Sequence, residues 1–309
     1  MNGERAVVLG GTGGVWMVRA SSGDVHDAAL RGRLKQEGRS KLAVGDDVTV
    51  ERDERGGTWA ITCIHDRRSV LSRRAPGGAR AERIVAANVD QVVVVFAMVK
   101  PEPHVRMLDR FLVIAEGNDL GARIVLNKVD LASAEDVDAL AAPYETAGYS
   151  VHRTSARQRI GLDALHDALA GKVSAFTGPS GTGKSSLLNA LYEGLDLRTG
   201  AISESVNKGR HTTVGARLVP LEDARGGYVV DTPGLREVGL WGLPPDRLDH
   251  CFPEFKPYLG QCRFQDCAHG AEPGCAVRQA VESGVVAAAR YESYLKLRAE
   301  TPDPGKHWE

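Results

Sequence analysis

Residues 172–185 read Lys-Val-Ser-Ala-Phe-Thr-Gly-Pro-Ser-Gly-Thr-Gly-Lys-Ser, and this stretch decides the fold class of the chain. Its first part, residues 172–176, is typical of a buried strand, and residues 184–192 carry a helical pattern. Between them, residues 178–185 match the phosphate-binding pattern G-x-x-x-x-G-K-[ST] in the strand-loop-helix context that this motif requires. The glycines let backbone N–H groups converge on phosphate groups at a helix N-terminus. The pattern therefore predicts a nucleotide-binding α/β domain, but it does not select the base.

The base is selected by a second motif, Asn127-Lys128-Val129-Asp130, which follows the predicted strand 123–126. We expect the carboxylate of Asp130 to accept hydrogen bonds from guanine N1–H and the N2 amino group, a pair of donors that adenine lacks. Asn127 can bond the base edge and brace the neighbouring loop, and the stem of Lys128 can lie over the ring. The motif therefore predicts GTP and GDP as the ligands.

A third stretch near the base is Thr154-Ser155-Ala156, which ends the predicted strand 150–153. It matches the loop whose backbone contacts the guanine carbonyl oxygen, although the triplet is a weak signal without its neighbours. The residues expected to contact GTP are Asn127, Lys128, Val129, Asp130, Ser155, Ala156, Gly178, Pro179, Ser180, Gly181, Thr182, Gly183, Lys184, Ser185, Ser186, Asp231 and Gly234.

The γ-phosphate and Mg²⁺ are expected to be sensed by residues late in the sequence. The tetrapeptide Asp-Thr-Pro-Gly at 231–234 follows a predicted strand, so Asp231 can hold the Mg²⁺ shell and the Gly234 N–H can contact the γ-phosphate. In the loop Gly-Arg-His-Thr-Thr, Thr213 is the expected Mg²⁺ ligand, with Thr212 as the alternative. We expect GTP to order both loops and hydrolysis to release them.

Catalysis is expected to involve Lys184, which reaches the β- and γ-phosphates, with Ser185 and Thr213 as the Mg²⁺ ligands. Leu235 occupies the position at which Ras-like proteins carry the glutamine that orients the attacking water. Leucine cannot do this, so intrinsic hydrolysis should be slow unless another residue or a partner supplies a polar group. His211 is a candidate for that group, and the alternative is that it only shapes its loop.

The order of these motifs is informative. The guanine motif at 127–130 comes first, the phosphate loop at 178–185 second and the motif at 231–234 last. In an ordinary P-loop GTPase the phosphate loop leads and the guanine motif trails. The inverted order predicts a circularly permuted GTPase. Because all nucleotide loops lie at the carboxyl ends of one parallel sheet, permuting the strands leaves the site intact.

The rest of the chain divides into three expected domains. Residues 1–83 read as about five short strands separated by glycine turns, which indicates a small barrel, either an OB-fold or an SH3-like barrel, with a linker or mobile loop at 72–83. Residues 84–240 alternate strands and helices, which predicts a doubly wound parallel sheet. Residues 241–309 are irregular and end in two predicted helices. The six strands expected in the sheet are residues 91–97, 123–126, 150–153, 172–176, 216–220 and 228–230.

The C-terminal region carries a cluster with metal-ligand spacing, Cys262-x₄-Cys267-x-His269-x₅-Cys275. Three thiolates and one imidazole predict a closed, structural Zn²⁺ site with no open position for catalysis. The alternative is a group of buried reduced cysteines. Zinc would supply much of the folding free energy of this domain. Cys63 and Cys251 are interpreted as ordinary buried residues.

Composition narrows the class of protein further. The net charge is −1 over 309 residues, so no strong overall field attracts a polyanion. Residues 1–83 nevertheless carry +4, with six arginines between positions 67 and 83, which leaves a solvated surface or an RNA-facing patch open. No signal region or membrane-length apolar run is visible, and an odd number of cysteines, five, argues against a disulfide scaffold. We expect a cytoplasmic monomer without membrane contact.

With these motifs in their order, the sequence resembles the bacterial RsgA (YjeQ/YloQ) family of small-ribosomal-subunit-dependent GTPases. The matching features are the three nucleotide motifs, the Gly-Arg-His-Thr-Thr loop, the Cys/His spacing and the phrase Ala-Asn-Val-Asp-Gln at 87–91. The resemblance implies an N-terminal OB-fold, a central permuted GTPase domain and a C-terminal zinc domain. It also implies a late assembly factor of the 30S subunit that contacts 16S rRNA and whose GTP hydrolysis the subunit stimulates.

Two other functions remain open at this point. The chain could be a GTP-gated RNA-binding switch in which hydrolysis serves only release, or a permuted GTPase that serves the large subunit. The permutation also suggests a mechanical hypothesis, in which the last strand of the sheet runs through the switch into the zinc domain. GTP would then set the relative orientation of the two flanking domains.

Overall fold

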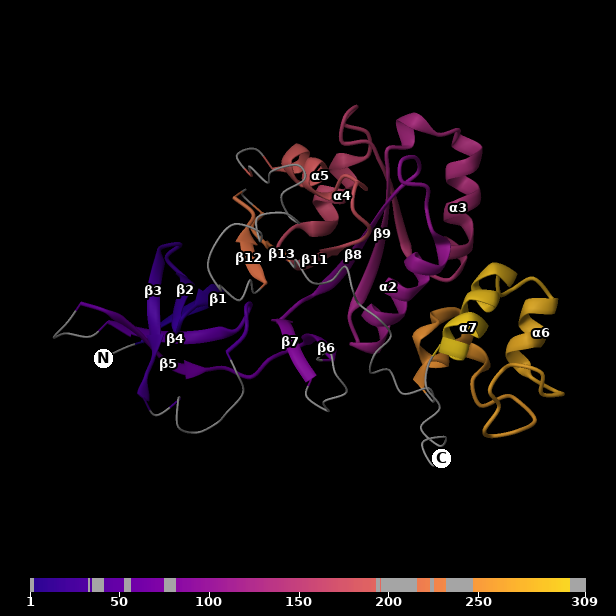
Figure 1. The fold of residues 1–309 in the computed structure, drawn as a ribbon, viewed down its shortest axis with the longest axis horizontal. Coiled ribbons are helices and arrows are strands. Elements are labelled where there is room, and N and C mark those ends of the chain that lie inside the picture. The colour runs from indigo at the N-terminus through magenta and orange to yellow at the C-terminus, as the bar shows by residue number, and fades with distance from the viewer. Residues whose placement is uncertain are drawn as a thin grey trace.

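A computed structural model describes residues 3–32, 34, 42–52, 57–74, 82–192, 195, 216–222, 225–231 and 247–300. The chain forms an elongated molecule with three parts in a row: a β-barrel, a central sheet with helices on both faces, and a C-terminal helical part (Figure 1). The three parts follow each other in this order along the chain, so each is built from one continuous segment. The barrel also contacts an edge of the sheet, where β1 lies against β12.

The first part is a closed barrel with strand order β1-β2-β3-β5-β4, which confirms the prediction of a small OB-type barrel. Strands β3 and β5 pair in parallel, and the other pairs are antiparallel. Its strands are β1 (Glu4–Thr12), β2 (Val15–Ala20), β3 (Val25–Leu30), β4 (Asp47–Arg52) and β5 (Trp59–Ile64). The interior is filled by fully buried β-branched residues, among them Val8, Val18, Val48, Val50 and Ile61.

A β-bulge in β5 corrects the interpretation of Cys63 as a buried residue, because the structure exposes it. The register shifts so that Val50 pairs with Ile61 while Thr49 pairs with Cys63. The extra residue between them breaks the alternation of inward and outward side chains. Ile61 therefore points into the barrel, and Cys63 points away from it.

The stretch 72–83 overlaps both strands of a β-hairpin. Strands β6 (Val70–Arg74) and β7 (Glu82–Ala87) pair antiparallel and form a two-stranded sheet, so the prediction of a linker or mobile loop is wrong for residues 72–74 and 82–83. Residues 75–81 lie outside the described part. Leu71 and Ala86 of this hairpin are buried and belong to the same core as the central sheet. The hairpin therefore leads the chain from the barrel into that sheet.

The central sheet has six strands in the order β10-β9-β8-β11-β13-β12. They are β8 (Gln91–Ala97), β9 (Gly121–Asn127), β10 (Ser150–Thr154), β11 (Val173–Thr177), β12 (Arg217–Pro220) and β13 (Tyr228–Asp231). Five strands are parallel, as predicted, but the edge strand β12 runs antiparallel to β13. The connection at 221–227 is too short for the crossover that two parallel strands would need.

Strand β8 lies at the centre of the sheet and is buried along its whole length. Its alternate residues face two separate cores, with Val92, Val94 and Phe96 on one side and Val93 and Val95 on the other. The first core is covered by α2 (Val105–Gly117) and α3 (Ala134–Thr146), and the second by α4 (Leu162–Leu169) and α5 (Lys184–Leu191).

The C-terminal part packs on helix α2. It consists of the short helices η4 (Asp249–Cys251) and η5 (Pro253–Tyr258), followed by α6 (Ala276–Glu282) and α7 (Ala288–Glu300). Its core contains Phe252, Phe255, Tyr294 and Leu297, and Val113 of α2 belongs to the same cluster. This part therefore shares its core with the central sheet domain.

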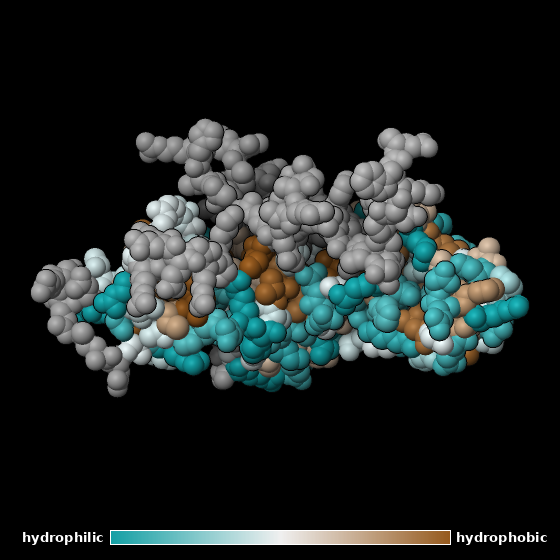
Figure 2. Space-filling model, turned by 90° about the horizontal axis from the view of Figure 1, so that it is seen from below, coloured by the Kyte–Doolittle hydropathy of each residue, from teal (hydrophilic) through white to brown (hydrophobic). Residues whose placement is uncertain are grey.

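Figure 2 shows one face of the molecule, on which most of the described surface is hydrophilic. On the face shown in Figure 2, hydrophobic residues appear in separate areas among hydrophilic ones. The large exposed hydrophobic side chains include Val15 of β2, Val105 of α2, Leu131 of η1 and Val285 in the turn between α6 and α7, so they are spread along the chain. Among the described residues, no helix has both the length and the apolar character needed to cross a membrane.

Candidate nucleotide and metal sites

The phosphate loop lies between the carboxyl end of β11 and the first turn of α5, as its sequence predicts. Two of its glycines are sterically required. Gly178 has φ 132°, and a Cβ there would lie 2.1 Å from the carbonyl oxygen of Val95. Gly183 has φ 92°, and a Cβ there would lie 2.5 Å from the Nδ2 atom of Asn127. The loop is therefore seated closely against strand β8 and against the guanine motif.

Lys184, the first residue of α5, folds over this loop. Its Nζ atom donates hydrogen bonds to the carbonyl oxygens of Gly178 and Pro179, each at 2.7 Å. Thr182 is fully buried and its hydroxyl donates to the carbonyl oxygen of Pro179 at 3.1 Å. The ammonium group and the N–H groups at the start of α5 carry the positive charge that binding of a phosphate would require.

Asn127, the last residue of β9, connects the loops that surround the predicted nucleotide site. Its Nδ2 atom donates to the carbonyl oxygen of Thr182 in the phosphate loop at 2.9 Å. Its Oδ1 atom accepts from the Ala156 N–H and from the hydroxyl of Thr154, each at 3.3 Å. Since Asn127 is 1% exposed, these bonds form in a buried environment, where they are costly to lose. The amide thus braces the phosphate loop, the guanine motif and the 154–156 stretch.

Lys128 makes a second connection between the guanine motif and the phosphate loop. It adopts a left-handed conformation with φ 62°, and its Nζ atom donates to the carbonyl oxygen of Gly181 at 2.7 Å and to that of Lys100. Burial lowers the pKa of Lys128. Asp130 follows in the short helix η1 (Val129–Leu131) and is half-buried.

The Lys100 carbonyl is a part of this site that sequence reasoning missed. It lies just beyond the carboxyl end of β8, for which no motif was identified. The usable signal is topological, because every parallel strand of such a sheet ends at the edge where ligands bind. The residues after β8 are therefore candidates even without a recognisable motif.

The remaining predicted nucleotide residues are only partly described. Asp231 is the last residue of β13, which pairs in parallel with β11, so its backbone lies at the same edge of the sheet as the phosphate loop. His211, Thr212, Thr213, Gly234 and Leu235 lie outside the described residues.

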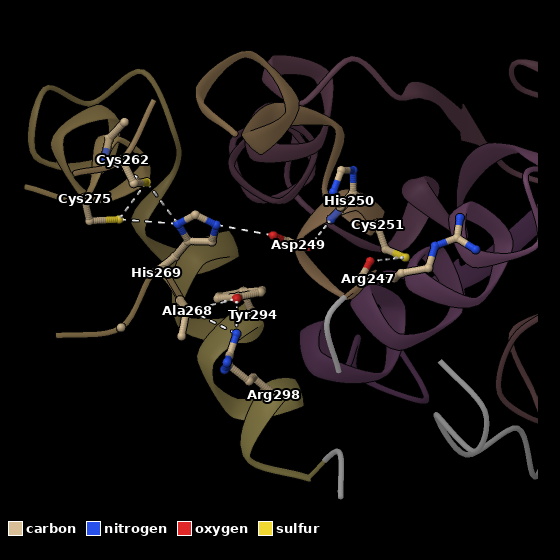
Figure 3. Close-up of polar contacts among 12 residues, drawn as sticks. Arg247, Asp249, His250, Cys251, Cys262, Ala268, His269, Cys275, Tyr294 and Arg298 are labelled. Atoms are coloured by element: carbon tan, nitrogen blue, oxygen red, sulfur yellow. Dashed lines mark hydrogen bonds and ion pairs between the residues drawn. The ribbon is translucent and has the colours of Figure 1, made fainter. Parts of the chain in front are cut away.

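The predicted metal ligands come together in the C-terminal part (Figure 3). The ligand atoms of Cys262, Cys267, His269 and Cys275 all lie within 4.8 Å of one another. The sulfurs of Cys262 and Cys275 are 4.0 Å apart, and each lies 3.5 Å from His269 Nδ1. In a tetrahedral zinc site, two sulfurs are about 3.8 Å apart and a sulfur and a nitrogen about 3.6 Å. The cluster therefore fits a structural metal ion.

The backbone supports the charge that metal binding requires. Ala276 N–H points at the sulfur of Cys262 at 3.4 Å, and Arg278 N–H at that of Cys275 at 3.5 Å. Although burial acts in the opposite direction, the Ala276 N–H and the neighbouring thiols lower the pKa of Cys262. Cys251 is buried outside the cluster, and burial raises the pKa of its thiol to about 12, which suits the predicted structural role.

Helix α7 fixes the chain around His269. The hydroxyl of Tyr291 donates to the His269 carbonyl oxygen at 2.6 Å, and the hydroxyl of Tyr294 donates to the Ala268 carbonyl oxygen at 2.9 Å. His269 itself has φ 56°, a conformation that needs such support. The ligand is thus held by its backbone as well as by its ring.

The six-stranded sheet, with the guanine motif before the phosphate loop and both at one edge, defines the class of circularly permuted P-loop GTPases. The sequence profile described as RsgA GTPase matches residues 64–241. The chain belongs to the RsgA GTPase family.

Proteins named "Small ribosomal subunit biogenesis GTPase RsgA" are similar over nearly the whole length. The Gemmatimonas aurantiaca protein is 61% identical over 297 residues, covering 95% of this chain and 96% of that protein. The Bacteroides fragilis protein is 35% identical over 309 residues, covering 98% of each.

Two solved structures share the fold. YjeQ from Thermotoga maritima has a TM-score of 0.80 and 36% identity, covering 96% of this chain and 98% of that one. YloQ, described as a circularly permuted GTPase, has a TM-score of 0.76 and 29% identity, covering 97% and 95%. The prediction of family and permuted fold is confirmed.

Proposed function

We propose that this GTPase acts in the assembly of the small ribosomal subunit, and that the 30S particle stimulates its hydrolysis of GTP. The observation that carries the proposal is the bracing of phosphate loop and guanine motif by Asn127, which builds one site for a guanine nucleotide. Relatives covered over nearly their whole length are named as small ribosomal subunit biogenesis GTPases. The barrel and the C-terminal part are the elements available for contacts with 16S rRNA.

Within this proposal each nucleotide residue has one task. Lys184 binds the β- and γ-phosphates, Ser185 and Thr213 coordinate Mg²⁺, and Asp130 recognises guanine. Asp231, at the same edge of the sheet, supports the Mg²⁺ shell. Mg²⁺ supplies charge neutralisation on the phosphates when it is bound, and the residues of the chain orient GTP around it.

The four clustered ligands Cys262, Cys267, His269 and Cys275 hold one Zn²⁺ ion in this proposal. The ion is structural, because four protein ligands complete its tetrahedral shell and leave no position for a reacting group. The protein works as a cytoplasmic monomer with domains at 1–83, 84–240 and 241–309.

The proposal is tested by measuring GTP hydrolysis with and without purified 30S particles, together with co-sedimentation in the presence of GDP and a non-hydrolysable GTP analogue. We expect turnover to rise with 30S particles and binding to depend on the nucleotide. Nucleotide-dependent binding without stimulation would favour a GTP-gated binding switch. Preferential co-sedimentation with 50S particles would favour a factor of the large subunit.

Hydrolysis also needs a group that orients the attacking water, which Leu235 cannot provide. His211 is our candidate. We expect His211→Ala to lower 30S-stimulated turnover by about 100-fold with little change in GTP affinity, since a positioned histidine contributes about that much. Unchanged turnover would mean that His211 only shapes its loop.

A further inference from the structure

The metal cluster has a fifth polar neighbour that does not belong to its sequence motif. Asp249 lies in η4, outside the segment that supplies the four ligands. Its Oδ2 atom is 3.3 Å from His269 Nε2, on the side of the ring opposite the sulfurs (Figure 3). His269 Nδ1 faces the sulfurs of Cys262 and Cys275, each at 3.5 Å.

This arrangement assigns one function to each ring nitrogen. A neutral imidazole carries a proton on one nitrogen and a lone pair on the other. If Nδ1 faces the metal, Nε2 must carry the proton, and a carboxylate at hydrogen-bonding distance accepts it. Such an outer partner fixes the tautomer and the orientation of a histidine ligand.

Asp249 is itself held in place. Its Oδ1 atom accepts from the His250 N–H at 2.8 Å, which leaves Oδ2 directed at the histidine ring. The short helix is anchored by Leu248, which precedes it, and by Cys251, its last residue, because both are buried in the core cluster that includes Val113 of α2. The carboxylate is therefore carried by a segment fixed to the GTPase domain.

We propose that Asp249 is a positioning residue of the metal site, which keeps the proton of His269 on Nε2 so that Nδ1 is free to bind the metal. The inference rests on the proposed zinc site. It means that the metal centre is completed from two segments, the Cys/His segment and η4 on helix α2. Metal binding thereby fastens the Cys/His segment to η4, the element of the C-terminal part that packs on helix α2.

The test compares Asp249→Ala and Asp249→Asn with Asp266→Asn in the full chain. Asp266 is an exposed acid in the loop between Cys262 and Cys267, so it controls for the loss of one negative charge near the metal. Zinc affinity is measured by competition with a chromogenic chelator. We expect Asp249→Ala to weaken it by about 10- to 100-fold. Asp249→Asn should lose less, since its amide oxygen can still accept the bond, and Asp266→Asn should stay within about twofold.

A second measurement separates positioning from general loss of structure. In the zinc-loaded wild type, nitrogen-15 NMR should show His269 protonated on Nε2 with slow proton exchange. The same proton should exchange rapidly in Asp249→Ala while the four-ligand Co²⁺ spectrum stays tetrahedral. If Asp249→Ala does not fold, Asp249→Asn supplies both readouts.

Two results would overturn the inference, and they differ. A wild type without stoichiometric zinc would remove the metal site and this inference together. Zinc bound at wild-type affinity by Asp249→Ala, or by the folded Asp249→Asn with unchanged proton exchange, would leave the zinc site standing and remove only the role of Asp249.

Discussion

At the scale of single residues, Asn127 does more than a base-contacting side chain would. Both ends of its amide are used to tie loops together, and its position leaves no room for a Cβ at Gly183. The guanine motif and the phosphate loop therefore form one unit. A substitution in one motif should therefore also disturb the conformation of the other.

We expect Asn127→Ala to weaken the binding of both GDP and GTP by about 1–3 kcal/mol, because it leaves buried partners such as the Thr182 carbonyl without a donor. Titration with a fluorescent guanine nucleotide measures the effect. Gln158→Ala, an exposed amide in the loop after Ala156, is the control and should bind normally. Equal affinities for Asn127→Ala and wild type would contradict the bracing role.

Asp130 allows a test of base selection that depends only on hydrogen-bond chemistry. We expect Asp130→Asn to shift preference from GTP toward xanthosine triphosphate, because an amide can donate to the carbonyl that replaces the guanine amino group. Competition between the two nucleotides measures the shift, which should exceed about tenfold. Unchanged selectivity would show that another residue reads the base.

At the scale of elements, Arg290 of α7 joins three segments in a buried ion network. Its Nη1 atom is 2.5 Å from Asp109 Oδ1 in α2, and its Nε atom is 2.7 Å from Glu254 Oε1 in η5. The guanidinium also lies over the rings of Tyr144 and Phe252, at 5.3 and 4.7 Å from their centroids. Burial acts to lower the pKa of Arg290, but the two carboxylates raise it above its usual value.

We expect Arg290→Met to destabilise the protein by about 3–5 kcal/mol, because it leaves Asp109, which is 0% exposed, without its cation. Urea unfolding measures the loss. Lys296→Met is the control on the same helix, since its ion pair with Glu292 is exposed and should contribute under about 0.5 kcal/mol. Adding Asp109→Asn to Arg290→Met should recover part of the loss, and strict additivity would contradict a direct pair.

Most elements of the central domain could be predicted because their sequences are long and regular. β8 is a continuous apolar run, and the phosphate loop fixes β11 and α5 on either side of it. β3 had no comparable signal, because Val-His-Asp-Ala-Ala-Leu contains one β-branched residue and is stabilised by its neighbours in the barrel. The direction of β12 follows from tertiary pairing, which a strand pattern does not specify.

The candidate sites could be predicted to a similar extent. Motifs identified Asn127, Lys128 and the four metal ligands, because each site chemistry needs fixed residue types at fixed spacing. Lys100 and Asp249 had no such signal: one contributes a backbone carbonyl, which any residue has, and the other comes from outside the Cys/His segment. Only the folded structure identifies these two residues as parts of the sites.

At the scale of the whole molecule, the barrel contacts the edge of the sheet that leads to the predicted switch. Leu9 of β1 and Leu218 of β12 share one core, and Arg19 pairs with Glu222 at 3.3 Å. β12 in turn pairs with β13, which ends at Asp231. The hypothesis that nucleotide state sets the position of the flanking parts therefore has a contact through which it could act on the barrel.

Metal removal should affect more than the cluster, since the C-terminal part has a small core that it shares with α2. We expect chelation to lower stability by about 3 kcal/mol or more, or the melting temperature by about 10 °C. Differential scanning calorimetry with and without a chelator measures the change, and re-addition of Zn²⁺ should reverse it. An unchanged melting temperature after verified metal loss would contradict a structural ion.

The central position of β8 also determines how the molecule resists pulling. The chain runs from the barrel through β7 to the start of β8, and β13 is the last strand of the sheet, in chain order, that the structure describes. Tension between the two ends of the molecule would therefore pull parallel strands past each other along their length. Rows of ladder hydrogen bonds between β8, β11 and β13 would then have to break together, so the sheet that carries the nucleotide site is loaded in shear.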